Sequence, residues 1–225
     1  MSTPKTTRWI GIGLLGLPLY GALTFWSSLH PQPDPSTHYE AWSHFVTTNH
    51  YVLTHVLGSI LGLILAIFGT FVLGAYLTRS RAGRLGLVAM IITVLGSALF
   101  LPAVRVSAFA SPEEGQAYLA GIEEFAKLPS TFADAVFAAT SLLVFVLLFV
   151  GNALLGVAIW RSGTLPRWAG ALLAGAAVLM YPLGLVIAAT VTGSTPPTVL
   201  VGALVIGGRG WRGRSLADPP PRRWE

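Results

Sequence analysis

Five histidines are the side chains in this sequence best suited to chemistry, and they all fall within one short stretch. They are His30, His38, His44, His50 and His55. Imidazoles with a carboxylate, here that of Glu40, suit zinc, copper or iron. A metal site formed by His38, His44, His50 and His55 is one hypothesis. Their spacing matches no known ligand motif, and His50 and His55 would point to different faces of a helix.

Haem is a second candidate cofactor for these histidines. A membrane haem held by two histidines usually takes them from facing spans. Here His55 is the only histidine inside an apolar segment. We therefore expect no cofactor, with a transition metal or haem as the alternative.

Three other polar positions lie near the ends of apolar segments. His55, Arg105 and Asp134 would line a ligand pocket that opens to the outer side of a membrane, if their segments pack together. Each residue also has a structural interpretation. His55 can bond to a neighbouring backbone group or hydroxyl, and Arg105 can extend to lipid head groups. Asp134 can form a capping box with Thr131.

The rest of the sequence argues against several kinds of chemistry. It contains no cysteine, which excludes disulfides, thiolate metal sites and thiol catalysis. No serine stands in a recognisable nucleophile turn. Apart from His55 and tyrosines, the apolar segments hold no ionisable group in their interior, and Asn152 is the other strongly polar residue there. Ion-coupled transporters normally need such groups, so transport is a less favoured alternative.

These residues must be positioned by long apolar segments. The chain is 53% hydrophobic and 10% charged, whereas a soluble domain has about 25% charged residues. We expect an all-α bundle of six transmembrane helices in one domain over residues 1–211, and a disordered tail over 212–225. The spans lie at about 9–26, 51–78, 85–104, 132–160, 168–191 and 197–211. The sixth is short and ends in glycines, so it could instead be re-entrant.

The basic residues indicate the orientation of the spans. Of the 14 lysines and arginines, all except Arg105 and Lys127 fall on the side of the two termini. The positive-inside rule places that side in the cytoplasm. We therefore expect a multi-pass protein of the inner (plasma) membrane with both termini cytoplasmic. Its basic residues would meet anionic lipid, and nucleic acid is not expected as a partner.

Two short helices are expected between spans on the outer side. Thr37 and Glu40 form a capping box that would begin an interfacial helix before the second span. Ser111, Pro112 and Glu114 give a stronger start signal after the third span. The segment 112–127 is amphipathic. We expect it to lie flat over the outer end of the bundle.

Two apolar segments resemble each other, which favours an internal repeat. Gly69, Leu73, Gly74, Arg79 and Ser80 recur as Gly151, Leu155, Gly156, Arg161 and Ser162. Both segments run from outside to inside, so the repeat would be a parallel one, of two-helix hairpins. Small residues at helical spacing after His55 also predict a close helix–helix contact on that face.

The turn after the second copy, RSGTLPRWAG at 161–170, resembles a pattern in uncharacterised bacterial multi-span membrane proteins. The resemblance implies a helical bundle and no particular activity.

The functional expectation follows from these observations. We expect a non-enzymatic accessory subunit, or a binder or sensor of a lipid or small apolar molecule, with a pocket beneath the helix 112–127. One alternative is a metal- or haem-dependent membrane oxidoreductase that uses the outer histidines. Another is a small-molecule transporter with a kink at Pro182. Membrane lipids, a partner membrane subunit or a second copy of the chain are the expected partners.

Overall fold

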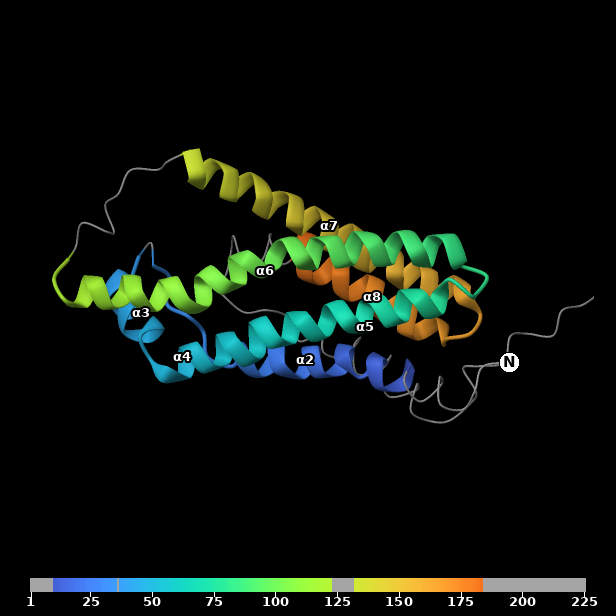
Figure 1. Cartoon of the computed structure of the whole chain (residues 1–225), viewed down its shortest axis with the longest axis horizontal. Coiled ribbons are helices and arrows are strands. Elements are labelled where there is room, and N and C mark those ends of the chain that lie inside the picture. The colour runs from blue at the N-terminus through green and yellow to red at the C-terminus, as the bar shows by residue number, and fades with distance from the viewer. Residues whose placement is uncertain (1–9, 36, 123–131, 184–225) are drawn as a thin grey trace, which may run out of the picture.

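The computed structural model describes residues 10–35, 37–122 and 132–183, and within them it contains helices and no strands (Figure 1). The helices are α2 (Gly16–Ser27), α3 (Tyr39–Val46), α4 (Asn49–Leu53), α5 (Gly62–Leu77), α6 (Gly83–Leu119), α7 (Phe132–Ser162) and α8 (Arg167–Val178). There are also two π-helical segments. The segment η1 (Thr54–Leu61) joins α4 to α5, and η3 (Leu179–Leu183) follows α8.

Four helical stretches are long and apolar enough to cross a membrane. They are Ile10–Ser27, Asn49–Leu77, Gly83–Leu119 and Ala139–Ser162, and a shorter apolar helix covers Arg167–Tyr181. Phe68, Phe71 and Leu142 are each more than half exposed, as expected for side chains that face lipid. The chain is therefore a helical membrane protein. The first four predicted spans overlap these stretches, although the third helix continues to Leu119, beyond its predicted end at 104. The fifth is described as far as residue 183. The predicted sixth span and the tail lie outside the described residues.

Helix α6 differs from the prediction. It continues through Pro102 and Pro112 for 37 residues, a length of about 55 Å at 1.5 Å per residue. The prediction that a separate helix begins at Ser111 is therefore wrong, because residues up to Leu119 belong to α6. Glu114 makes no capping box there, because no helix begins at Ser111. Its carboxylate accepts a hydrogen bond from the Tyr39 hydroxyl at 2.7 Å. Burial and this bond raise the pKa of the Tyr39 phenol. Residues 123–127, the end of the predicted flat helix, lie outside the described residues.

The short helix before the second span is confirmed as α3, but its predicted cap is wrong. The residue before α3 is His38, and its side chain makes no capping hydrogen bond. Thr37 bonds to His38 Nδ1 at 2.8 Å instead. Helix α3 packs on the extension of α6, where Gly115 leaves room for it: a Cβ there would lie 3.0 Å from Ser43 O. We call this end of the bundle the α3 end.

The opposite end, which we call the turn end, contains the α5–α6 and α7–α8 turns (Figure 1). The two turns are built alike. Ser80 Oγ donates to Leu77 O at 2.7 Å, and Ser162 Oγ donates to Ile159 O at 2.8 Å. Each serine oxygen then accepts from the backbone N–H two residues further on, at 3.1 and 3.2 Å. Ser80 and Ser162 thus stabilise their turns with the same pair of hydrogen bonds.

The glycines of the two similar segments also have corresponding contacts. Gly69 lies against α2, which belongs to the candidate span before α5, and Gly151 lies against α6, which belongs to the candidate span before α7. Gly74 lies against α6, the helix after α5, and Gly156 lies against α8, the helix after α7. The contact predicted for the face after His55 is present as well, because Gly58, like Gly69, packs on α2.

The buried apolar residues form two separate clusters. One, at the α3 end, consists of Trp42, Val46 and Tyr51. The other, at the turn end, consists of Leu14, Leu73, Leu77, Ala82, Ala89, Leu155, Ala158, Ile159 and Ala169. Within the described residues, the backbone of α8 packs on α7 and has no close contact with the backbone of α2 or α5.

Candidate functional site

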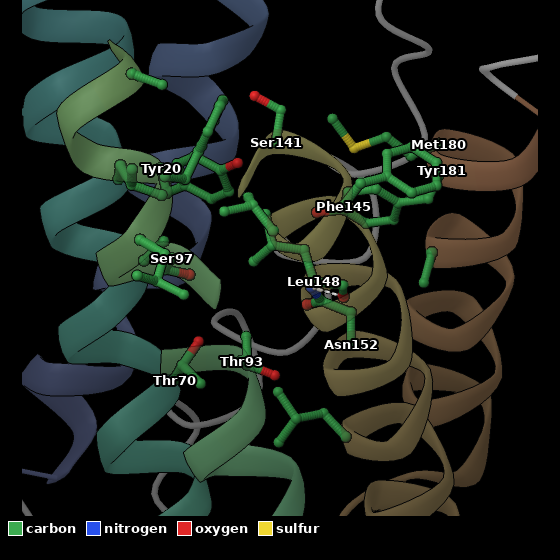
Figure 2. A pocket seen from close by; sticks show the side chains of 18 of the residues that line it. Tyr20, Thr70, Thr93, Ser97, Ser141, Phe145, Leu148, Asn152, Met180 and Tyr181 are labelled. Atoms are coloured by element: carbon green, nitrogen blue, oxygen red, sulfur yellow. Dashed lines mark hydrogen bonds between the residues drawn. The ribbon is translucent and has the colours of Figure 1, made fainter. Parts of the chain in front are cut away.

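A cavity of about 840 Å³ lies within the helix bundle. It is lined by residues of α2, α5, α6, α7, α8 and η3 (Figure 2). Leu73 and Leu155 of the turn-end cluster line it on one side. The cavity thus extends away from the packed turn end, toward the level of Pro102 and Val136.

The walls of the cavity are mostly apolar. The apolar lining residues are Leu17, Leu63, Ala66, Leu73, Leu99, Phe100, Pro102, Ala103, Val106, Val136, Val144, Phe145, Leu148, Leu155, Leu173, Ala176, Ala177 and Met180. The described part of the lining contains no Asp, Glu, Lys, Arg or His. A charged guest would therefore find no opposite charge on these walls, and burying it would cost much free energy.

Polar side chains line the cavity at several levels. Tyr20, Ser141 and Tyr181 lie toward one part of it, and Thr70, Thr93 and Asn152 toward another (Figure 2). The Tyr181 ring is held edge-on against Phe145, with centroids 5.4 Å apart. Aromatic contacts of this kind fix the ring position.

Some of these polar groups are satisfied by their own helix. Thr93 Oγ1 donates to Ala89 O at 2.8 Å, and Thr140 Oγ1 donates to the carbonyl four residues before it, also at 2.8 Å. Asn152 Nδ2 donates to Leu148 O at 2.8 Å. Back-bonding to the preceding turn is common for hydroxyl side chains in membrane helices.

Thr70 and Ser97 differ from them. Each is only 4% exposed, and each lines the cavity. Within the described residues neither hydroxyl has a hydrogen-bond partner. Two buried hydroxyl groups thus remain free to bond to a guest.

The residues of the predicted outer pocket lie elsewhere. His55 is half-buried in η1, where its Nδ1 is 2.9 Å from Tyr51 O and its ring lies on the Tyr51 ring at 3.9 Å. Arg105 is exposed on α6. Neither residue lines the cavity. Asp134 lies in the first turn of α7, and its side chain is outside the described residues, so a pocket that joins all three stays a prediction.

The histidines proposed as metal ligands are spread over the α3 end. His38 bonds to Thr37, and His44 is exposed on α3. His50 Nε2 lies 3.2 Å from Nδ1 of His30, which was not in the predicted set. In the parts of the chain that are described, no three potential metal ligands come together.

The contacts of Tyr51 lead to a stability prediction. Its hydroxyl donates to Ser107 O at 3.0 Å and lies 3.2 Å from Ser107 Oγ, and the residue is 1% exposed. Tyr51→Phe should therefore lower the free energy of unfolding by about 1 kcal/mol, measured by denaturant titration in detergent. The control is Tyr76→Phe, whose hydroxyl has no hydrogen bond within the described residues. Equal losses in both variants would contradict the role assigned to Tyr51.

Comparison of the chain with protein-family models, with curated proteins and with solved structures finds no match in any of the three. The cavity is therefore the feature of the chain that indicates a function.

Sequence reasoning singled out only Asn152 among the polar residues of the cavity. The sequence does contain a pattern that groups Thr70 and Thr93 with Asn152. Thr70, Thr93 and Asn152 each lie nine residues from an arginine at a turn, namely Arg79, Arg84 and Arg161. At 1.5 Å per residue they share a depth of about 13 Å from the turn end. Equal depth on three helices is a reason to group polar residues into one site.

Proposed function

We propose that this protein is a non-enzymatic membrane protein that binds one lipid or small apolar molecule in the cavity, as a binder, a sensor or the ligand-holding subunit of a larger assembly. The cavity itself carries the proposal. Its 840 Å³ falls within the range of about 300–1,000 Å³ typical of small-molecule sites, which are mostly apolar with a few placed polar groups.

The surrounding surface supports a guest that arrives through the membrane. The large exposed side chains of α5 and α7, such as Phe68 and Leu142, are apolar, so lipid is the natural neighbour of these helices. A guest taken up from lipid would exchange one apolar environment for another. Its affinity would then depend on shape and on the few polar contacts inside the cavity, because transfer from lipid adds little hydrophobic free energy.

We also propose the topology that the sequence predicts: six spans, with the turn end in the cytoplasm and the chain in an inner (plasma) membrane. The exposed arginines of the turn end support this orientation, since basic residues concentrate on the cytoplasmic side. They are Arg79, Arg81, Arg84, Arg161 and Arg167. The matched turn serines and glycines support a parallel repeat of two-helix hairpins.

The proposal is tested by photolabelling in lipid nanodiscs. The probe is hexadecanol that carries a diazirine on its chain. Labelling of the lining residues of α7, such as Val144 and Leu148, should saturate at about one probe per protein and fall when unlabelled hexadecanol is added. Leu142, which is exposed on the same helix, is the internal control, and its labelling should rise in proportion to probe concentration. Labelling of Val144 and Leu148 that never saturates would refute a specific site.

A further inference from the structure

Several polar residues of the cavity lie on three different helices at the end of the cavity nearer the turn end. Thr70 on α5, Thr93 on α6 and Asn152 on α7 all lie about 13 Å from the turn end by helix geometry, and all line the cavity. Ser97 is one turn further along α6 and also lines it. Figure 2 shows these four side chains on the helices that surround one region of the cavity. The Thr93 hydroxyl is already bonded to Ala89 O. We call the other three residues, Thr70, Ser97 and Asn152, the polar level.

The polar level has bonding capacity that the described residues do not use. Thr70 and Ser97 are buried residues that line the cavity, and their hydroxyls have no hydrogen bond to any described group, unlike the hydroxyls of Thr93 and Thr140. Asn152 uses one amide hydrogen for Leu148 O, and its carboxamide oxygen has no partner in the described residues. Polar groups that line a cavity and have no protein partner are available to bond to a guest.

The chemistry of that group follows from what the polar level offers. Hydroxyls both donate and accept, and the Asn152 oxygen accepts. None of these groups carries a charge, and neither does any other described residue of the lining. At this depth a charged head group would lose its hydration without gaining a counter-ion. A neutral hydroxyl or carbonyl would complete the hydrogen bonds at no such cost.

We infer that the polar level binds the head group of the guest, and that the guest is an uncharged apolar molecule with a hydroxyl or carbonyl head group. The head group would lie at the end of the cavity nearer the turn end. This inference rests on the proposed function and narrows it to one ligand class. It excludes intact phospholipids, whose charged head groups would have to enter the bundle. The apolar body of the guest would extend along Val144 and Phe145 toward Pro102.

The test is competition against the photoreactive hexadecanol in nanodiscs. The competitors share one chain and differ in the head group: hexadecanol, 2-hexadecanone, hexadecane, hexadecyltrimethylammonium and hexadecanesulfonate. The alcohol, the ketone or both should compete at about tenfold lower concentration than hexadecane, which corresponds to about one neutral hydrogen bond. The two permanently charged competitors should be weaker than hexadecane. The alcohol and ketone arms distinguish a hydroxyl head from a carbonyl head.

Variants link the preference to the polar level. Thr70→Val and Ser97→Ala should each reduce the ratio of hexadecanol to hexadecane affinity severalfold and leave hexadecane affinity unchanged. Thr140→Val is the matched control: it removes a lining hydroxyl that is already bonded to Val136 O, so the ratio should stay constant. A fold defect would alter both affinities together and is thereby recognised.

The outcomes separate this inference from the proposed function. If labelling saturates but hexadecane competes as strongly as hexadecanol, the inference about the head group is overturned. The proposed apolar binding site would remain. Stronger competition by a charged competitor would also overturn the inference. If labelling of the lining residues does not saturate at all, the proposed function fails, and the inference fails with it.

Discussion

Gly156→Ala is expected to lower the free energy of unfolding by about 1–3 kcal/mol, the usual cost of overpacking a close contact. A Cβ at Gly156 would lie 2.6 Å from both Ala174 N and Gly170 O of α8. These are backbone atoms, so no side-chain rotation relieves the overlap. The two helices must separate instead, and the α7–α8 contact supports one wall of the cavity.

Gly175→Ala is the matched control for this prediction. Gly175 lies on α8, one residue beyond Ala174, and a Cβ there would meet nothing within 4 Å. Both substitutions gain the same helix propensity, about 1 kcal/mol for alanine over glycine, so the difference between them isolates the overlap. Denaturant titration in detergent measures both variants. Equal stabilities would mean that α7 and α8 do not approach as closely as described.

Ala66→Phe and Ala177→Phe should each weaken probe binding by about 10- to 100-fold, since steric overlap costs about 1–3 kcal/mol and each 1.4 kcal/mol is tenfold. Ala66 on α5 and Ala177 on α8 both line the cavity and are buried. A phenyl group at either position occupies space that the guest needs. Because the two positions belong to different helices, agreement between them argues against a local distortion.

The controls place the same side chain on the lipid-facing side of the same helices. Ala75 on α5 and Ala171 on α8 are exposed and do not line the cavity. Ala75→Phe and Ala171→Phe should therefore bind the photoreactive hexadecanol with unchanged affinity. Binding that survives both cavity-filling substitutions would show that the labelled site is not this cavity.

The sequence supported the first four spans and α3, because both depend on local patterns. A span needs only enough consecutive apolar residues to cross the bilayer, and α3 needs only apolar residues at helical spacing. The same kind of reasoning failed at Ser111. Its cap signal was sound locally, but Glu114 bonds to Tyr39, a residue that is distant in sequence. Helix α3 packs on α6, and α6 is continuous through Pro112.

The cavity lies apart from His55 and Arg105, which the sequence brought forward as site residues. His55 was a candidate because an ionisable residue inside a span is unusual. Its hydrogen-bond partner, however, is the carbonyl oxygen of Tyr51, one turn away in the same helix. Thr70 and Ser97 did not stand out, since hydroxyl residues are common in spans and most bond to their own helix. Whether they do so cannot be read from residue types.

The sequence by itself determined that this chain is a helical membrane protein and where its first four spans lie, because the bilayer imposes its thickness on each apolar segment separately. Only the tertiary structure decided that α8 has no close backbone contact with α2 or α5, that a cavity lies in the bundle, and that the hydroxyls of Thr70 and Ser97 in its wall have no partner among the described residues. Those properties depend on how side chains of different helices meet, and close contacts such as that of Gly156 with α8 are set jointly by both helices.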